Sequence, residues 1–414
     1  MKKKRVLLIC YYFPPQGGAG VGRPLALYKQ LPDYGIDCDI LTVKPVAYRY
    51  HEPELLDGLD TQRIYRAGSH DPQRLMYLLG IRKVKDAAIS KARSISDRYF
   101  PEPKVGWVRP AARLGRVLAN NRNYDCILST SPPIPSHLVG QIISKEFKLP
   151  WIADFRDFWT GYKPEDWFNN ERQVKRARAL LDDFSGKATA VTVVSPAIAE
   201  YLKRGVVIYN SYDENRAQLW NVPTDDQKFT IGVLGTIDEQ RPIEPLFKVV
   251  ADIRRHNPEG YARTRILHVG SMNAPDFESL LDKYQLGGRV ELCGVQKRER
   301  TIEILSEASM LYLGFSDPYG SWLVTGRLFD MLASGRPILA SAPQDGVAGR
   351  LIDETGNGYL FDDDRIDRAA EFVLSKIKSC AGREFVCEPN PPYARKYASS
   401  KMVEAMAQVI DKHT

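Results

Sequence analysis

The sequence has few cysteines, and they are far apart. Its 414 residues contain Cys10, Cys38, Cys126, Cys293, Cys380 and Cys387, and no two of them form a short paired motif. Most fall in segments expected to be strands, where a buried thiol behaves as a small apolar side chain. We therefore expect reduced cysteines that neither bind a metal nor act in catalysis.

Long apolar runs are also missing. A membrane-spanning helix needs roughly 20 apolar residues in a row, and no segment approaches that length. The basic start, Met-Lys-Lys-Lys-Arg, precedes only the short apolar run Val6 to Cys10, which is too short for a signal peptide. These absences favour a cytoplasmic protein.

Acidic residues are scarce in one segment. The net charge is +7, but residues 74–122 hold twelve Lys or Arg and only three acidic residues, a local charge of +9. Apolar residues recur there at helical spacing, at Val84, Ala88, Ala92, Ile95 and Tyr99. A basic amphipathic helix is typical of a contact with an anionic membrane or an anionic acceptor, which we assign to Lys83, Lys85 and Lys91.

That segment also has another interpretation. Its apolar stripe would equally pack a solvated helix onto its own domain, and we leave both readings open. No nucleic-acid recognition motif accompanies the positive charge, so we expect no nucleic-acid partner.

The order of apolar segments predicts two α/β domains. A buried strand, a glycine-rich turn, a helix and a second buried strand open the chain, and this pattern restarts after Asn221. The fold class is therefore α/β, with two doubly wound, Rossmann-like domains facing each other across a cleft. We expect an N-terminal domain at 1–215 and a C-terminal domain at 225–388, with a final helix within 392–414 packing back on the first.

A phosphate-binding helix start is predicted near the C-terminal end. Thr325, Gly326 and Arg327 open an apolar helix that ends at Ser334-Gly335, and the free amides of a helix N-terminus suit an anion. Asp330, one turn further on, is an acceptor suited to the vicinal hydroxyls of a ribose. Any α/β domain turns from helix to strand in a similar way, so the segment alone does not decide between the two readings.

Two loops after expected strands carry further candidates. Gly17 and Gly18 belong to a glycine-rich turn that lacks the third glycine of a dinucleotide fingerprint and the lysine of a Walker loop, which leaves a weak anion contact. In the second half, a strand ends at Gly235-Thr236, and Arg241 follows in the loop. Arg241 could contact a diphosphate with two nitrogens or simply lie on the surface.

Polar residues also follow two strands in the first half. Asp154, Arg156 and Asp157 lie between aromatic residues at a strand end, where they point to a site or to an internal Arg-Asp ion pair. His137 follows the segment Ser129-Thr-Ser-Pro-Pro near a helix start, and it could act in catalysis or be structural.

Taken together, these motifs resemble the GT-B glycosyltransferases, in particular family 4 of the retaining sugar-nucleotide enzymes. The resemblance spans nearly the whole chain, and its most specific segments are Asp-Phe-Arg-Asp-Phe-Trp and Thr-Gly-Arg-Leu-Phe-Asp-Met-Leu-Ala-Ser-Gly-Arg-Pro-Ile. It implies an acceptor on the N-terminal domain, a sugar nucleotide on the C-terminal domain, and no required cofactor or metal.

The resemblance assigns roles residue by residue. Gly17 and Gly18 would face the diphosphate and the acceptor, Arg241 would neutralise the leaving diphosphate, and the turn residues Gly235 and Thr236 would lie beside it. Phosphate would be held by Thr325, Gly326 and Arg327, and ribose by Asp330. Two positions depart from the family, which usually has Glu at 330 and a further Glu where this chain has Trp322.

The predicted activity is hexosyl transfer from a nucleotide sugar to a glycan or lipid-linked acceptor in cell-surface polysaccharide synthesis. Retention follows from the family; an inverting enzyme would need a base, for which Asp157 and His137 are the candidates. The alternatives are a sugar-nucleotide epimerase or hydrolase and a non-catalytic binding protein. We expect a cytoplasmic location, with peripheral contact at the inner face of the membrane.

Overall fold

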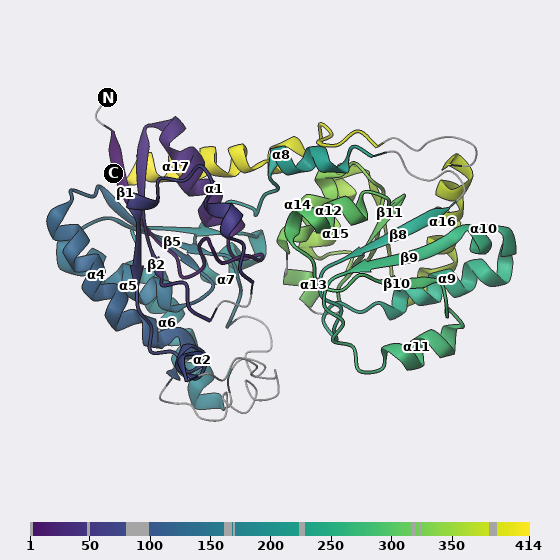
Figure 1. Cartoon of the computed structure of the whole chain (residues 1–414), viewed down its shortest axis with the longest axis horizontal. Helices are drawn as coiled ribbons and strands as arrows, with labels where there is room; N and C mark the ends of the chain where they lie inside the picture. The colour runs from purple at the N-terminus through teal and green to yellow at the C-terminus, as the bar shows by residue number, and fades with distance from the viewer. Residues whose placement is uncertain are drawn as a thin grey trace. The chain divides into compact units, whose positions relative to one another are not determined.

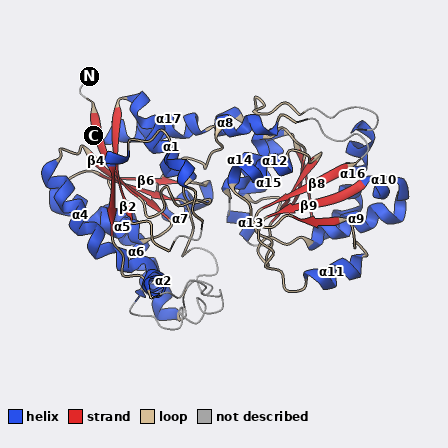
Figure 2. Cartoon of the chain, in the orientation of Figure 1, coloured by secondary structure: helices blue, strands red, loops and turns tan. Residues whose placement is uncertain are grey.

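The computed structural model describes residues 3–47, 50–79, 99–160, 168, 170–222, 228–316, 319–322, 324–380 and 387–414. The chain divides into two compact units. Unit 1 comprises residues 1–209 and 400–414, and unit 2 comprises residues 210–399. In each unit, helices cover a parallel sheet (Figure 1 and Figure 2).

Unit 1 contains a seven-stranded sheet in the order β3-β2-β1-β4-β5-β6-β7. The interior strand β1 pairs in parallel with β2 and β4, so that Val6 lies between Cys38 and Cys126. This doubly wound order brings the carboxyl ends of all strands to one edge. The strands are β1 (Lys4–Ile9), β2 (Ile36–Val43), β3 (Ile64–Ala67), β4 (Cys126–Ser131), β5 (Trp151–Phe155), β6 (Ala190–Val193) and β7 (Val206–Val207).

Both faces of this sheet are buried. Leu7 and Ile9 of β1 belong to one apolar cluster, and Val6 and Leu8 belong to another, because successive strand side chains point to opposite faces. The helices of this unit are α1 (Gly22–Gln30), α2 (Pro72–Leu78), α4 (Val108–Asn121), α5 (Pro135–Phe147), α6 (Glu171–Lys187), α7 (Pro196–Leu202) and, from the end of the chain, α17 (Ser399–His413).

The C-terminal helix α17 completes the second of these clusters. Met402, Val403, Met406 and Ile410 are buried together with residues of β1 and α1. An ion pair of 2.9 Å joins Lys4 Nζ to an Asp411 carboxylate oxygen at the same place. The two ends of the chain therefore stabilise the same unit.

Unit 2 repeats the doubly wound arrangement with six parallel strands in the order β10-β9-β8-β11-β12-β13. Its central strand β8 pairs with β9 on one side and β11 on the other. The strands are β8 (Phe229–Leu234), β9 (Thr264–Val269), β10 (Val290–Leu292), β11 (Met310–Gly314), β12 (Ile338–Ser341) and β13 (Gly358–Phe361).

The helices of unit 2 bury an apolar cluster against this sheet. Phe229, Ile231 and Val233 of β8 share it with Phe247 of α9 and Val373 of α16. The helices are α8 (Glu214–Ala217), α9 (Glu244–His256), α10 (Pro258–Arg263), α11 (Phe277–Tyr284), α12 (Arg298–Leu305), α13 (Tyr319–Trp322), α14 (Gly326–Ala333), α15 (Val347–Thr355) and α16 (Ile366–Cys380). Among the described helices, none combines the length and apolar character needed to span a bilayer.

The segment between the two sheets packs with unit 2. Arg336 is fully buried, and its guanidinium donates to the backbone oxygens of Trp220 and Val222 at 3.0 and 3.3 Å. These bonds fix the segment that follows α8 to the second sheet. This segment belongs to unit 2, which begins at Asn210.

Candidate functional site

A glycine turn follows the central strand of unit 2. Strand β8 ends at Leu234, and Gly235 has a φ of +93°, a conformation that favours glycine. A Cβ atom at this position would lie 3.2 Å from Nη1 of Arg327. Glycine therefore allows the guanidinium of Arg327 to lie against the backbone, and the partly buried Thr236 follows in the same loop.

Arg241 closes this loop. Its amide donates to the backbone oxygen of Asp238 at 3.0 Å, and its Nε donates to Oδ1 of the same residue at 3.0 Å. A second contact joins Nη2 of Arg241 to Oδ2 of Asp238. The loop thus fixes the guanidinium with a carboxylate of its own turn, and the Arg241 side chain remains 27 % exposed.

Helix α14 begins beside these residues with an incomplete cap. Thr325 is the N-cap residue and has extended backbone angles, yet its side chain makes no capping hydrogen bond. Its Oγ1 is buried and has no partner among the described residues. Around Gly326 no atom lies within 4 Å of the position of a Cβ. The side chain of Thr325 therefore leaves the first amides of the helix uncapped, as an anion site requires.

Arg327 extends from this helix start to the glycine turn. Nη1 donates to the backbone oxygen of Leu234 at 2.6 Å, whereas the buried Nε has no partner among the described residues. Burial, together with the positive charge of Arg241, lowers the pKa of Arg327 to about 10. Two like charges are therefore held near each other at the carboxyl ends of the adjacent strands β8 and β11.

Asp330 lies one turn inside α14 and already has a cationic partner. Nη2 of Arg298 donates to Oδ2 and Oδ1 of Asp330 at 3.0 and 3.2 Å. The Asp330 side chain is 14 % exposed and that of Arg298 31 %. The predicted ribose acceptor is thus part of an ion pair at the edge of the site.

In unit 1, the glycine turn after β1 is tightly packed. The amide of Gly17 donates to the backbone oxygen of Tyr50 at 3.0 Å, and a Cβ there would lie 1.8 Å from Oε1 of Glu52. Gly18 has a φ of +91°. A backbone carbonyl thus occupies the Gly17 amide, and a contact of Gly17 and Gly18 with the diphosphate and the acceptor stays a prediction.

Beside this turn lies a buried ion pair. Asp154 is fully buried and accepts from Nε and Nη2 of Arg23 at 3.0 and 2.7 Å. The hydroxyls of Thr130 and Thr192 also donate to this carboxylate. Burial alone would raise the pKa of Asp154, but Arg23 and these hydrogen bonds bring it below its ordinary value. Asp154 therefore does not face a ligand; the internal ion-pair reading holds, with Arg23 as the partner.

Arg156 is buried as well, and backbone oxygens surround it. Nε donates to Ser131 at 2.9 Å, Nη1 to Gly20 at 3.0 Å and Nη2 to Pro132 at 3.2 Å. It fixes the glycine turn to the end of β4. The adjacent Asp157 is only partly buried, and burial raises its pKa to about 6 in spite of the nearby Arg156.

His137 lies in the core of unit 1. The residue is fully buried, its Nδ1 is 2.8 Å from Oγ of Ser129, and its ring centre is 4.4 Å from that of Phe155. Burial lowers the pKa of His137 to about 3. A ring with no access to solvent cannot reach an acceptor hydroxyl, so the structural reading is favoured over the catalytic one.

Solved structures of similar fold cover the whole chain. Sucrose-phosphate synthase from Thermosynechococcus elongatus has 15 % identity and a TM-score of 0.64, covering 99 % of this chain and 98 % of that one. HepE from Anabaena, in complex with UDP-glucose, has 14 % identity and a TM-score of 0.63, covering 99 % of each chain. The catalytic domain of starch synthase IV from Arabidopsis thaliana, bound to ADP and acarbose, has 11 % identity and a TM-score of 0.58, covering 99 % and 98 %. These similarities establish the GT-B fold.

Sequence comparison identifies the enzyme class. Residues 19–210 match the family described as glycosyl transferase 4-like domain. The chain carries a glycosyltransferase domain and has the GT-B fold. The fold and the enzyme class predicted from the motifs are thereby confirmed. A comparison with curated proteins gave no match.

In this glycosyltransferase, the predicted donor residues fall into one group. Gly235, Arg241, Thr325, Gly326 and Arg327 converge at the carboxyl ends of β8 and β11, and Asp330 lies one turn away from them. The residues Lys83, Lys85 and Lys91, predicted to contact a membrane or an acceptor, lie outside the described residues.

Two arginines of this glycosyltransferase were not recognised in the sequence. Arg23 stands in the first turn of α1, and its pairing with Asp154 is not visible in the sequence. Arg298 does not belong to any of the motifs that the sequence analysis describes. The sole signal for Arg23 was a charged residue at the start of an otherwise apolar helix, where burial demands a partner.

Proposed function

We propose that this glycosyltransferase moves a sugar from a nucleoside-diphosphate donor to a hydroxyl of a glycan or lipid-linked acceptor. The observation that carries the proposal is the pair of guanidinium groups, Arg241 and Arg327, beside the uncapped start of α14. The buried Thr325 Oγ1 and Arg327 Nε lack partners among the described residues, and both can donate to phosphate oxygens.

The charges of this group favour a ligand with more than one negative charge. Asp238 pairs with Arg241, but among the described residues no carboxylate pairs with Arg327, which instead donates to a backbone oxygen. Burying an uncompensated charge is unfavourable. A diphosphate would supply the missing negative charge, accept from both guanidinium groups and contact the helix amides.

The same group explains how the transfer would be accelerated. As the bond between the anomeric carbon and the phosphate oxygen breaks, the electron pair stays on that oxygen, and negative charge develops on the diphosphate. Arg241, Arg327 and the amides of α14 are fixed before the reaction and would stabilise this charge as it forms. The acceptor oxygen then bonds to the anomeric carbon.

Retention of configuration is the stereochemical outcome that we propose. In that case the departing phosphate oxygen takes the proton of the acceptor hydroxyl on the same face of the sugar, and no side chain has to act as a base. Asp157, with its raised pKa of about 6, is the candidate base for the inverting alternative. We leave His137 out of the proposed machinery because it is fully buried.

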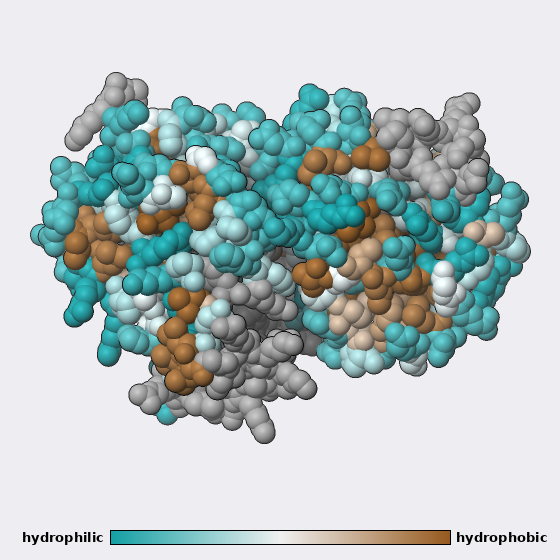
Figure 3. All heavy atoms as spheres, in the orientation of Figure 1, coloured by the Kyte–Doolittle hydropathy of each residue, from teal (hydrophilic) through white to brown (hydrophobic). Residues whose placement is uncertain are grey.

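We further propose that the protein binds its acceptor at a membrane surface and acts in cell-surface polysaccharide synthesis. Four exposed large side chains at the start of the basic segment 74–122 support this proposal. They belong to α2 or to its C-cap and are Leu75, Tyr77, Leu78 and Leu79. Figure 3 shows a brown, hydrophobic patch where Figure 1 places α2. Exposed leucines at the start of a basic segment are typical of docking to anionic lipid, and this supports the proposed location at the inner face of the membrane.

A donor screen with an acceptor mixture tests the proposal. Structures of similar fold contain UDP-glucose or ADP, so UDP- and ADP-sugars are the first donors to try, against glycan and lipid-linked acceptors. We expect nucleoside diphosphate and a glycosylated product in equal amounts. Free sugar or an epimerised donor without acceptor would favour a hydrolase or an epimerase, and tight nucleotide binding without turnover would favour a non-catalytic protein.

A further inference from the structure

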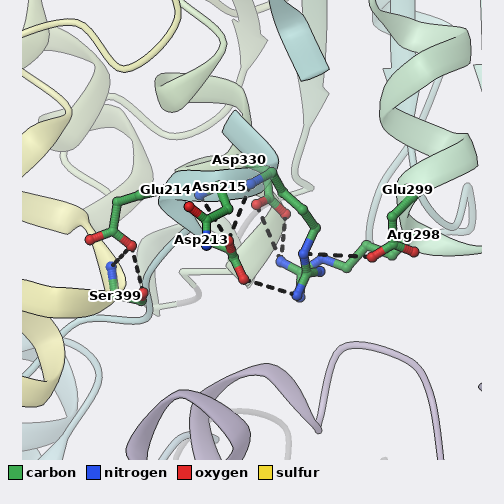
Figure 4. A network of polar contacts seen from close by, with 8 residues as sticks. Asp213, Glu214, Asn215, Arg298, Glu299, Asp330 and Ser399 are labelled. Carbon is green, nitrogen blue, oxygen red and sulfur yellow. Dashed lines mark hydrogen bonds and ion pairs between the residues drawn. The ribbon is translucent and has the colours of Figure 1, made fainter. Parts of the chain in front are cut away.

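The ion pair between Arg298 and Asp330 lies at the edge of the proposed donor site. Figure 4 shows the two side chains approaching each other from α12 and α14. A single nitrogen of Arg298, Nη2, contacts both carboxylate oxygens of Asp330. The Nε and Nη1 atoms of Arg298 have no hydrogen-bond partner among the described residues, and 31 % of its side chain is exposed.

A second arginine, Arg216, lies nearby and has carboxylate partners of its own, so that Arg298 pairs with Asp330. Arg216 of α8 contacts Asp213 at 3.2 Å and Glu299 at 3.7 Å. Burial and the like charge of Arg298 lower the pKa of Arg216. Because Asp213 and Glu299 contact Arg216, the remaining donors of Arg298 stay open to solvent or to a ligand.

The position of Asp330 on α14 relates the pair to the proposed diphosphate. Asp330 is four residues beyond Gly326, which corresponds to about 6 Å along the helix axis. Helical side chains also lean toward the N-terminus of their helix. A nucleotide whose phosphate lies on the first amides of α14 therefore brings its ribose within reach of Asp330 and its partner.

The hydrogen-bonding capacity of the pair matches a vicinal diol. Each ribose hydroxyl both donates and accepts, whereas an ionised carboxylate only accepts and a guanidinium only donates. Asp330 alone would satisfy the two hydroxyl protons and leave the hydroxyl oxygens without donors. The open Nε and Nη1 of Arg298 supply those donors.

We propose that Arg298 is a specificity-determining residue, which donates to a ribose hydroxyl oxygen while its Nη2 holds Asp330 in place to accept from the diol. The inference rests on the proposed function, since it needs a nucleoside diphosphate at α14. It goes further in assigning recognition of the sugar of the nucleotide to a residue of α12, and it makes the protein selective for ribonucleotides over 2′-deoxyribonucleotides.

The test compares nucleotides that differ by one hydroxyl. Dissociation constants are measured by calorimetry on the full chain for UDP and 2′-deoxy-UDP, and for ADP and 2′-deoxy-ADP, with inorganic pyrophosphate as a third probe. For whichever base binds more tightly, we expect the wild type to bind the ribonucleotide roughly 10- to 100-fold more tightly than its 2′-deoxy form. This is the range for a hydrogen bond to a charged group. Arg298→Met should reduce this ratio at least severalfold, because it removes both a donor to the hydroxyl oxygen and the nitrogen that positions Asp330.

Two further variants make the result specific. Arg298→Lys keeps the charge but loses the planar fork, and it should restore only part of the preference. Arg300→Met removes a charge from the same helix, where Arg300 pairs with Glu303 at 3.1 Å, and it should keep the wild-type ratio. Unchanged pyrophosphate binding by Arg298→Met would show that the phosphate site is intact, and if this variant does not fold, Arg298→Lys provides the comparison.

The outcomes separate this inference from the function on which it rests. If the wild type binds neither UDP nor ADP, the proposed donor site is wrong and the inference is wrong with it. If the wild type binds a nucleotide but does not distinguish ribose from deoxyribose, or if Arg298→Met keeps the full preference, the role of Arg298 alone is overturned.

Discussion

The two units have the same kind of sheet, but the charged side chains at its carboxyl edge have different partners in each. In unit 1, Arg23 and Asp154 are both buried and pair with each other, and Arg156 donates to three backbone oxygens. In unit 2, Arg327 lies near Arg241 and contacts no carboxylate among the described residues. In unit 1 the hydrogen bonds of both arginines are satisfied within the unit, whereas in unit 2 the buried Nε of Arg327 has no partner among the described residues.

This difference shows how to separate structural charges from ligand-binding charges. A buried charge whose partner is another side chain belongs to the fold, since removing either partner leaves the other uncompensated. A cation without an anionic partner lowers stability and is expected where a ligand completes the site. Mutations should therefore affect stability in unit 1 and activity in unit 2.

The largest effect is expected from breaking the pair in unit 1. Asp154→Ala leaves Arg23 buried without its anion, which should cost about 3–5 kcal/mol of the free energy of unfolding. For a unit of this size the melting temperature should fall by roughly 10 °C. Thermal unfolding followed by circular dichroism measures the change.

Two controls sharpen that measurement. The double variant Arg23→Met/Asp154→Leu removes both charges and should recover much of the lost stability. Arg116→Ala removes one member of an exposed pair with Glu146, in which both side chains are 44 % exposed, and it should cost no more than about 1 kcal/mol. Equal losses from Asp154→Ala and Arg116→Ala would contradict the comparison.

In unit 2, removing either arginine should impair catalysis and leave the fold intact. Arg327→Ala and Arg241→Ala should each lower turnover by roughly 10²- to 10³-fold, because each removes a donor to the developing negative charge. The melting temperature of Arg327→Ala should equal or exceed that of the wild type. Steady-state kinetics and thermal unfolding measure the two effects.

Lys248→Ala is the matched control in the same unit, since Lys248 pairs with Asp363 at 2.6 Å on the outer surface of α9. It should change neither turnover nor melting temperature appreciably. An Arg327→Ala variant that melts lower but turns over normally would place Arg327 among the structural charges.

Asp157 gives a smaller, pH-dependent effect. Burial raises its pKa to about 6, so the folded protein binds its proton more tightly than the unfolded chain, whose Asp has a pKa of about 3.9. The stability that comes from the protonated form is therefore lost as the pH rises from about 4 to about 6. Asp157→Asn mimics the protonated form and should lack this loss.

Urea unfolding across that pH range measures the difference between Asp157→Asn and the wild type, which should grow with pH and become constant above about pH 7. A difference independent of pH would show that the carboxyl is not perturbed. The same variant tests the mechanism, since most turnover should persist under retention, and a severe loss of activity would indicate a base.

The smallest effect is expected on the surface of unit 1. The double variant Leu78→Ser/Leu79→Ser should weaken binding to anionic vesicles by at least roughly tenfold, because a leucine side chain contributes about 1.5–3 kcal/mol when fully buried. Vesicle sedimentation measures the loss. Leu292→Ser changes an equally apolar exposed residue of unit 2 and should have no effect; equal losses in both variants would rule out docking through α2.

Much of the fold could be predicted because it depends on local patterns. The run 229–234 forms a strand with those bounds, since Lys228 precedes it and the turn glycine Gly235 follows it. The short strand Ile64–Ala67 was not predicted, because it lies at the edge of its sheet and only its first and last residues are buried. Strand β13 was also missed, since it begins at a glycine, a residue that rarely indicates a strand.

The site could be predicted only in part, because local motifs are visible in the sequence and contacts between distant residues are not. Glycines and cations after strand ends are visible in the sequence, and parallel sheets bring such ends together. Which charges pair is not visible: Arg23 and Asp154 are 131 positions apart, and Arg298 and Asp330 are 32 apart. The packing of the folded chain selects these partners, and it also buries His137.

The docking of α17 has a consequence for how the protein is made. Because Met402, Met406 and Ile410 lie in the same core as the first strand, unit 1 cannot be completed during translation until residues 400–414 have left the ribosome. The second sheet can assemble earlier, although it starts later in the chain. A fragment that stops at residue 209 would expose the apolar surface that α17 covers, and we expect it to aggregate unless the last helix is supplied as a separate peptide.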